Sequence, residues 1–249
     1  MDKFIVLAAR RSGVTLLLDS LNSHPQIQCY KGVFTTTNRL KFFEFDNPDS
    51  RFYKFRSASP KRQGDYVFRR KRLISTFLTE LYTSTAGVKA VGVRLSYIQA
   101  KKYPEVLEWA LENDVGIIHL VRKNSLKAIV SHFSARKRGL HHSTLKAERV
   151  TIRLSPLRLK RRLTRLTRQI EKYNAMLADK RHIKVYYETF TANRDTEIRR
   201  ILGFLEVDQS VPLTSDLIKL NPDSLENILE NYEAITRAFK GTVFEKYLV

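Results

Sequence analysis

Short apolar runs alternate with helical patterns along most of this 249-residue chain, and this alternation limits the folds open to it. Four runs have the length and composition of buried strands, and segments with an apolar stripe at helical spacing lie between them. The predicted strands are 4–8, 88–94, 116–121 and 183–187, and the predicted helices are 15–22, 73–83, 104–113, 124–138, 156–177 and 194–205. Strands that alternate with helices favour a mainly parallel sheet covered by helices on both faces. The sequence therefore predicts one α/β domain over residues 1–249.

The alternation breaks down between residues 31 and 72. Basic and aromatic side chains follow one another irregularly there, around Asn47-Pro48 and Ser59-Pro60. We expect a variable loop insertion of about 31–72 that runs over the surface, and long ordered loops are often functional. The aromatic residues between 42 and 55 indicate contact with the ring system of a ligand, such as a sugar or an alkaloid.

The charge and the cysteine content exclude several classes of protein. The formal net charge is +20, which suits nucleic acid, an anionic membrane face or a polyanionic small molecule, or else a solvated basic surface. No known nucleic-acid-reading motif follows the basic segments, so we expect no nucleic-acid partner. The single cysteine, Cys29, excludes a disulfide scaffold and a cysteine-based zinc cluster within one chain. No apolar run has the length of a membrane span or signal peptide, so we expect a cytoplasmic protein.

The loop after the first predicted strand has the features of a phosphate site. It reads Ala8-Ala9-Arg10-Arg11-Ser12-Gly13-Val14-Thr15 and leads into a helix. Glycine lets the backbone approach an anion, the helix N-terminus presents its amides, and the arginines and hydroxyls add charge and donors. It is not a Walker A loop, because no glycine opens it and Val14 follows Gly13 where lysine is required. The alternative is an ordinary strand–helix turn with surface arginines.

A second candidate anion site follows the strand 116–121. Arg122 stands at the end of that strand, and Ser131 lies on the following helix, on a stripe of small residues opposite the core face. Together these two side chains have the chemistry to hold a second phosphate, although a serine on a helix is often a packing residue. Ligands in parallel sheets bind at the carboxyl ends of the strands, which brings the two candidate sites close together.

These motifs together resemble the PAPS-dependent sulfotransferases of the bacterial carbohydrate and natural-product branch. Arg11-Ser12-Gly13-Val14-Thr15 is similar to the family loop that binds the 5′-phosphosulfate, and Arg122 with Ser131 is similar to its 3′-phosphate element. Tyr187-Glu188 resembles the family's Tyr-Glu pair, whose tyrosine contacts adenine. Lys240-Gly241-Thr242 resembles the closing segment, which returns a basic residue to the nucleotide.

The resemblance implies a P-loop-like three-layer fold and transfer of a sulfuryl group from PAPS, with PAP as product. The acceptor would be a hydroxyl or amine of a carbohydrate or small natural product. The transfer would be an in-line displacement that requires no metal. Arg11 would stabilise the charge that grows on the departing phosphate. The implied nucleotide-binding residues are Arg11, Ser12, Gly13, Val14, Thr15, Leu16, Arg122, Ser131, Tyr187 and Lys240.

The sequence departs from the family at the general base. Relatives carry glutamate in a Gly-Glu-x-Phe stretch, whereas this chain has Gly32-Val33-Phe34. Either another group takes the acceptor proton, or the acceptor is activated differently, or the chain is an inactive homologue. We favour Glu44 as the base because its loop lies nearest the missing glutamate. The other candidates are Asp46, His132, His141 and His142.

Two other functions remain open from the sequence. One is a nucleotide-binding P-loop-like protein, such as a kinase, which the absence of lysine after Gly13 disfavours. The other is a nucleic-acid-binding protein that uses the arginine-rich segment 149–168 as a phosphate-contacting face. That segment also keeps a clean apolar stripe, so its charges are equally consistent with the solvated side of a core helix.

Overall fold

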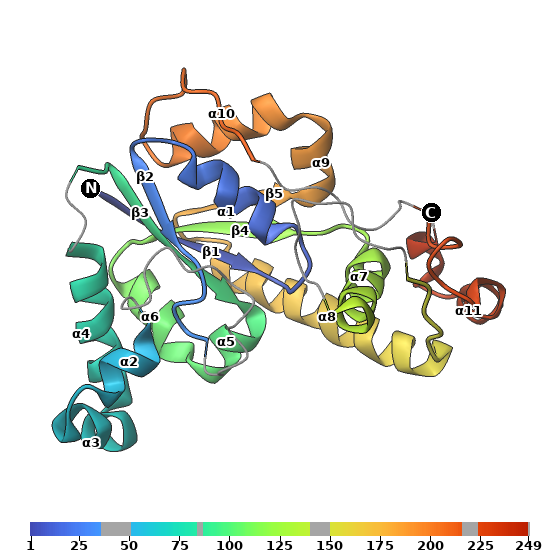
Figure 1. Ribbon diagram of the computed structural model, residues 1–249, viewed down its shortest axis with the longest axis horizontal. Helices are drawn as coiled ribbons and strands as arrows, with labels where there is room; N and C mark the ends of the chain where they lie inside the picture. Colours follow the sequence, from blue (N-terminus) through green and yellow to red (C-terminus); the bar gives the residue numbers. More distant parts are fainter. Residues whose placement is uncertain (36–50, 84–86, 140–149, 216–223, 249) are drawn as a thin grey trace.

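A computed structural model describes residues 1–35, 51–83, 87–139, 150–215 and 224–248 of the chain. Its centre is a sheet of parallel strands in the order β2-β3-β1-β4-β5 (Figure 1). The strands are β1 (Asp2–Ala8), β2 (Ile27–Tyr30), β3 (Ala90–Ser96), β4 (Gly116–Val121) and β5 (His182–Tyr186). The mainly parallel sheet that the alternation predicts is confirmed.

Helices cover both faces of the sheet because alternate strand residues are apolar on each side. Phe4 and Val6 of β1 face α1 (Val14–Asn22), α9 (Tyr187–Ala192) and α10 (Arg194–Phe204). Ile5 and Leu7 face α4 (Arg70–Thr83), α5 (Tyr97–Lys102), α6 (Pro104–Glu112) and the end of α8 (Pro156–Leu177). Near-continuous apolar strands of this kind are typical of parallel sheets buried on both faces. The predicted three-layer α/β fold is confirmed.

A second, smaller core lies beside the sheet. It packs α7 (Ser125–Arg138), the first half of α8, α11 (Tyr232–Phe239) and the 3-10 helix η3 (Glu245–Tyr247) around shared apolar side chains. The Ser155-Pro156 pair begins α8 as its sequence predicts, with Ser155 Oγ accepting from the backbone N–H of Arg158. Helix α8 joins the two cores, because Leu159 and Leu163 belong to the small core and Tyr173 and Leu177 to the core under the sheet.

The structure differs from the sequence prediction in the segment that was expected to be loop. Among its described residues, α2 (Phe52–Ser57), α3 (Pro60–Phe68) and the start of α4 are helical. Ser59 caps α3 by accepting from the N–H of Arg62 at 3.2 Å, and Pro60 occupies the first turn. A Ser-Pro pair therefore begins α3, as another one begins α8. Strand β2 was also missed, because four residues are too few for a clear pattern.

The described aromatic residues of that segment contribute to the core. Phe52 is 2 % exposed, and its ring lies 5.5 Å from that of Phe34 and 5.2 Å from that of Phe77. Phe55 packs on Phe77 at 5.1 Å. The interpretation of these rings as a ligand-binding surface is therefore wrong for Phe52, whose side chain is enclosed. The aromatic residues at 42, 43 and 45 lie outside the described part of the chain.

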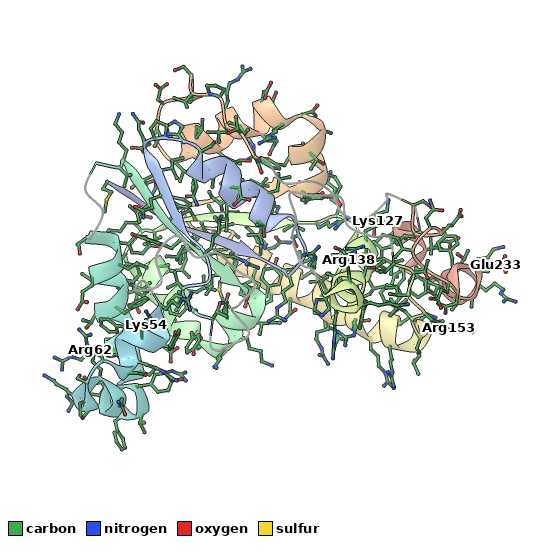
Figure 2. All side chains as sticks on the ribbon, in the orientation of Figure 1. Lys54, Arg62, Lys127, Arg138, Arg153 and Glu233 are labelled. Atoms are coloured by element: carbon green, nitrogen blue, oxygen red, sulfur yellow. The ribbon has the colours of Figure 1, made fainter. Side chains whose placement is uncertain are left out.

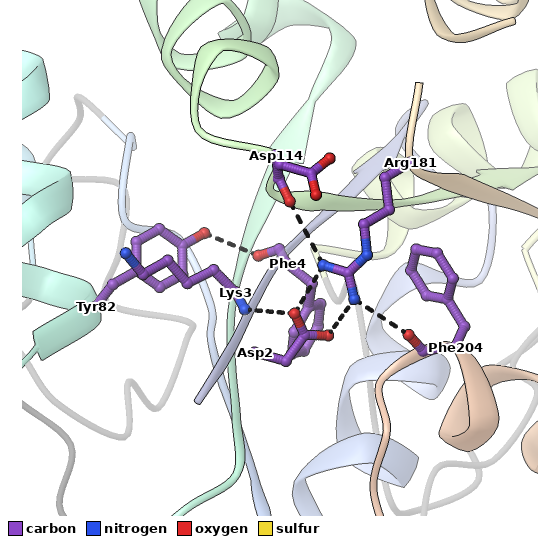
Figure 3. Close-up of polar contacts among 7 residues, drawn as sticks. All are labelled: Asp2, Lys3, Phe4, Tyr82, Asp114, Arg181 and Phe204. Atoms are coloured by element: carbon purple, nitrogen blue, oxygen red, sulfur yellow. Dashed lines mark hydrogen bonds and ion pairs between the residues drawn. The ribbon is translucent and has the colours of Figure 1, made fainter. Parts of the chain in front are cut away.

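An arginine joins three segments at the amino end of the sheet. The two terminal nitrogens of Arg181 donate to the two carboxylate oxygens of Asp2 at 2.8 and 2.9 Å (Figure 3). The same guanidinium lies 3.5 Å from the backbone oxygens of Asp114 and Phe204. Hydrogen bonding to Asp2 raises the pKa of Arg181. This contact fixes the start of β1 against the segment that leads into β5.

Candidate functional site

The loop between β1 and α1 has an unusual backbone. Arg11 has a φ of 63°, which few residues other than glycine adopt, and Gly13 has a φ of 84°. A Cβ on Gly13 would lie 2.1 Å from Cδ2 of Tyr187, so only glycine fits beneath that ring. Ser12, between them, is buried. The loop therefore holds its backbone in one defined shape at the N-terminus of α1.

Two loops meet at this point through side chains that are distant in sequence. The Nε–H of Arg11 donates to Oγ of Ser131 on α7 at 3.0 Å. A terminal nitrogen of Arg122, which follows β4, donates to the backbone oxygen of Arg11 at 3.3 Å. The guanidinium of Arg122 also lies over the ring of Tyr187, 4.9 Å from its centroid. The structure thus brings together Arg11, Ser131, Arg122 and Tyr187, all of which the sequence singled out.

Glu188 fixes the second loop. Its two carboxylate oxygens accept from the backbone N–H groups of Lys123 and Asn124 at 2.9 and 3.0 Å. The side chain of Asn124 then caps α7 by accepting from the N–H of Lys127 at 2.9 Å. Glu188 therefore holds Lys123 and Asn124, which directly follow Arg122, in place.

Positive charge is concentrated at this end of the sheet. Burial and the neighbouring Arg122 and Arg138 lower the pKa of Arg11 to about 10. Burial together with Arg10 and Arg11 likewise lowers the pKa of Arg94 to about 10. At neutral pH both guanidinium groups still carry their charge. Half-buried like charges of this kind favour a bound anion, which would offset their repulsion.

Arg94 is a site residue that the sequence interpretation missed. It is half-buried on β3, opposite Val6 of β1, and no ion pair or hydrogen bond of its guanidinium occurs within the described ranges. The strand side chains on either side of it, Val93 and Leu95, point into the core beneath the sheet. Arg94 consequently points to the α1 face. The signal was present in the sequence as a single cation near the end of an otherwise apolar strand.

A buried histidine lies on the other face of the sheet. His119 on β4 is fully enclosed, and its Nε2 is 2.6 Å from the hydroxyl of Tyr97. Burial, with smaller effects of Lys184 and His182, lowers its pKa to about 4. His119 is therefore neutral at physiological pH, and its enclosure separates it from the arginines on the α1 face.

The remaining predicted residues lie in different places. Val14, Thr15 and Leu16 form the first turn of α1, with Val14 buried and the other two half-buried. Lys240 is an exposed residue at the end of α11, and among the described residues its side chain makes no hydrogen bond or ion pair with the two loops. Its proposed contact with the nucleotide stays a prediction.

The candidate bases fall mostly beyond the described residues. Glu44, Asp46, His141 and His142 all do. His132 is half-buried on α7 and meets the ring of Phe133 edge-on at 5.6 Å. Val33 is completely buried among apolar side chains. Position 33 therefore carries no group that could accept a proton, and its side chain is closed off from solvent.

Comparison with known proteins identifies the family. The model of the sulfotransferase family matches residues 3–210. The chain belongs to the sulfotransferase family. Its family indicates sulfuryl transfer, which is the reaction class that the sequence resemblance implied. Comparison with curated protein sequences finds no match.

Solved sulfotransferase structures share the fold at low sequence identity. The sulfotransferase from Alicyclobacillus acidocaldarius aligns with a TM-score of 0.50 and 15% identity, over 100% of this chain and 96% of that one. The sulfotransferase domain of the Synechococcus PCC 7002 olefin synthase gives 0.50 and 17%, over 91% and 82%. The sulfotransferase domain from the curacin biosynthetic pathway gives 0.50 and 14%, over 87% and 76%.

Two further properties concern the described residues only. None of their helices is both long enough and apolar enough to cross a membrane. Nor do the described residues include a group of His, Cys, Asp and Glu side chains arranged to hold a metal ion.

Proposed function

We propose that this sulfotransferase takes its sulfuryl group from PAPS and transfers it to a hydroxyl or amine of a carbohydrate or small natural product. The observation that carries the donor assignment is the bond between Arg11 and Ser131. It joins the loop after β1 to α7, the helix that follows the second candidate loop, and Arg122 from that loop adds a second guanidinium to the same place. PAPS carries anionic groups at both its 3′ and 5′ positions, which matches a pair of joined sites.

Each end of the donor has matching residues. The backbone of Ser12, Gly13 and Val14, with the Arg11 guanidinium, would hold the 5′-phosphosulfate at the N-terminus of α1. Arg122 and Ser131 would hold the 3′-phosphate. The ring of Tyr187, which packs on Gly13, would contact adenine. The lowered pKa of Arg11 fits this assignment, because a bound anion would offset the repulsion from Arg122 and Arg138.

The reaction would be an in-line displacement at sulfur. A bond forms between the acceptor oxygen or nitrogen and sulfur while the bond from sulfur to the phosphate oxygen breaks. The bonding electron pair remains on the phosphate of the PAP product, and the acceptor proton passes to a base, for which we propose Glu44. Arg11 keeps its proton at neutral pH, so its contribution is electrostatic stabilisation of the leaving phosphate.

Ligand-dependent thermal stability tests the donor. A ligand that binds only the folded state raises the melting temperature with its concentration. We expect PAP and PAPS to raise it, and ATP with magnesium to leave it unchanged, because the first loop lacks the P-loop lysine. Stabilisation by ATP with magnesium and not by PAP would contradict the proposal and favour a nucleotide hydrolase or kinase.

A further inference from the structure

The exposed side of α8 carries a continuous row of cations. The members of this arginine stripe share exposure to solvent and a spacing of three or four residues; they are Arg158, Arg161, Arg162, Arg165, Arg168 and Lys172. Residues at this spacing lie above one another on one helix face. At a rise of 1.5 Å per residue, the stripe extends for about 21 Å. Side chains that end in nitrogen project outward from α7 and α8 on the lower side of the view in Figure 2.

The stripe has no acidic partners in the part of the chain that the structure describes. Other basic residues of the molecule do pair where an acid is near, as Arg70 does with Glu105 and Lys71 with Glu112, both at 2.6 Å. The stripe arginines form no such pair within the described residues, and Arg162 instead lies over the ring of Phe133. The single acid of α8, Glu171, forms no ion pair there.

The stripe does not serve the stability of the helix. Cations at i and i+4, such as Arg161 and Arg165, repel one another and destabilise a helix. Arg158 adds a positive charge in the first turn, where the helix dipole favours acids, and that turn has none. Both ends of α8 are nevertheless held in apolar cores. Helix α8 thus carries a row of cations that destabilises the helix itself. An anionic ligand bound along the row would offset this repulsion.

The position of the stripe relates it to the candidate active site. Helix α7 packs on α8 and also carries Ser131, which binds Arg11. Packed helix axes are 8–10 Å apart, so α8 lies one helix beyond α7, the helix that carries Ser131. A ligand that spans both must be a chain longer than a single sugar unit.

The composition of the stripe narrows the choice of polyanion. The one aromatic residue of α8, Tyr173, is buried, and stacking on aromatic rings is the usual source of affinity for single-stranded nucleic acid. The large exposed apolar residues of α8 are Leu157 and Met176, near its two ends, which leaves the stripe without an apolar band for a membrane. Arginine binds carboxylate and phosphate oxygens through two parallel donors, and a sulfate group presents the same tetrahedral oxygens as a phosphate.

We propose that the arginine stripe of α8 binds a linear acidic glycan, whose carboxylate or sulfate groups pair with successive arginines. This inference rests on the proposed function, since it makes the acceptor a polymer that reaches from the site across α7 to α8. The chemistry of recognition is a repeating anion on a flexible polysaccharide chain.

Binding measurements with defined polymers test the proposal. The probes are polygalacturonic acid for carboxylates, dextran sulfate for sulfates, and uncharged dextran as a control. The variant Arg161→Gln/Arg165→Gln/Arg168→Gln removes the middle of the stripe. The matched control Lys61→Gln/Arg69→Gln/Arg72→Gln removes the same charge from exposed positions on and beside α3 and α4, at the opposite end of the molecule (Figure 1). We expect the stripe variant to weaken binding of an acidic polymer about tenfold and to reduce its salt dependence.

The controls separate this proposal from its alternatives. We expect the control variant to bind the acidic polymer within about threefold of the wild type. Equal losses in the two variants would overturn the proposal, because net charge alone would then explain binding. The proposal would also be overturned if a DNA duplex or phosphatidylserine vesicles bound more tightly than either acidic polymer and lost this binding in the stripe variant.

Stabilisation by PAP provides a separate measure of the proposed function. We expect both variants to retain it, because neither set of substitutions touches the two loops. If the wild-type protein lacks this stabilisation, the donor assignment fails. The polymer measurements then still decide whether the stripe binds an acidic glycan.

Discussion

The two ends of the central sheet hold arginine in opposite ways. At the amino end, Arg181 makes two short bonds with Asp2, and hydrogen bonding raises its pKa. At the carboxyl end, Arg11 and Arg94 lie near other arginines, and burial and repulsion lower their pKa values to about 10. The first arrangement satisfies the charge within the fold. The second gathers like charges in one place, an arrangement that a bound anion would stabilise and that is typical of a binding site.

The sharpest test of this contrast is Arg11, for which we expect the largest effect. If Arg11 stabilises the leaving phosphate, Arg11→Ala lowers kcat by roughly 10²–10³, the scale for loss of one oxyanion donor. Arg11→Lys restores part of this, although lysine lacks the two-pronged contact. Steady-state kinetics with PAPS measures both. A raised KM for PAPS with an unchanged kcat would limit Arg11 to binding the donor.

His119, buried between the two ends, predicts a pH dependence that the arginines do not produce. Its pKa is about 4 in the folded protein and about 6.5 when unfolded, so between these values the unfolded state binds more protons. The free energy of unfolding should therefore fall by roughly 3 kcal/mol as the pH drops from 6.5 to 4. Urea unfolding across this range measures it. In His119→Gln this part of the pH dependence should disappear, and its persistence would contradict the assignment.

Arg122 tests whether the carboxyl end contains two separate anion sites. We expect Arg122→Ala to weaken PAP binding by about 1.5–3 kcal/mol, the value of a hydrogen bond to a charged group. The loss should be smaller for APS, which lacks the 3′-phosphate. Ser131→Ala should act in the same direction but less, because it removes one neutral group. Calorimetry with both nucleotides measures the difference, and equal losses would remove Arg122 from the 3′-phosphate site.

Removing one arginine from each end compares the ends directly. Arg181→Met should lower the free energy of unfolding by about 1–2 kcal/mol, since it removes the ion-pair partner of Asp2 and leaves only the hydrogen bond from the Lys3 N–H. Arg94→Met should raise the urea midpoint, because it removes a half-buried cation beside two like charges. PAP binding should be unchanged in the first variant. If both variants lose stability equally, the contrast between the ends is wrong.

Glu188 provides the smallest expected effect, because it acts through the loop that carries Arg122. Glu188→Ala frees the N–H groups of Lys123 and Asn124, and we expect PAP to bind about fivefold more weakly, with a smaller change for APS. Glu188→Gln keeps one acceptor and loses a nearby negative charge, so its affinity should remain within about twofold. Asp195→Ala, an exposed acid at the start of α10, is the matched control. Equal effects on PAP and APS would show that Glu188 supports the fold generally.

The sequence by itself determined the elements with strong local signals. Apolar runs located β1, β3, β4 and β5, and the Ser-Pro pair located the start of α8. The loop around Gly13 was recognised because a glycine, a serine and two arginines follow a buried strand, and the family that the whole set of motifs resembles was confirmed. These signals lie within a few residues of one another, so no knowledge of the tertiary fold is needed to read them.

Only the tertiary structure decided which distant residues meet and where like charges gather. The bond from Arg11 to Ser131 spans 120 positions, and the one from Arg122 to Arg11 spans 111. Arg94 looked like one cation among many until the parallel register placed it beside β1 and the described part of the chain offered it no acid. Phe52 was assigned to a loop because its partners, Phe34 and Phe77, come from separate segments. Burial and charge pairing depend on contacts between residues that are distant in sequence, so they cannot be predicted from the neighbouring residues alone.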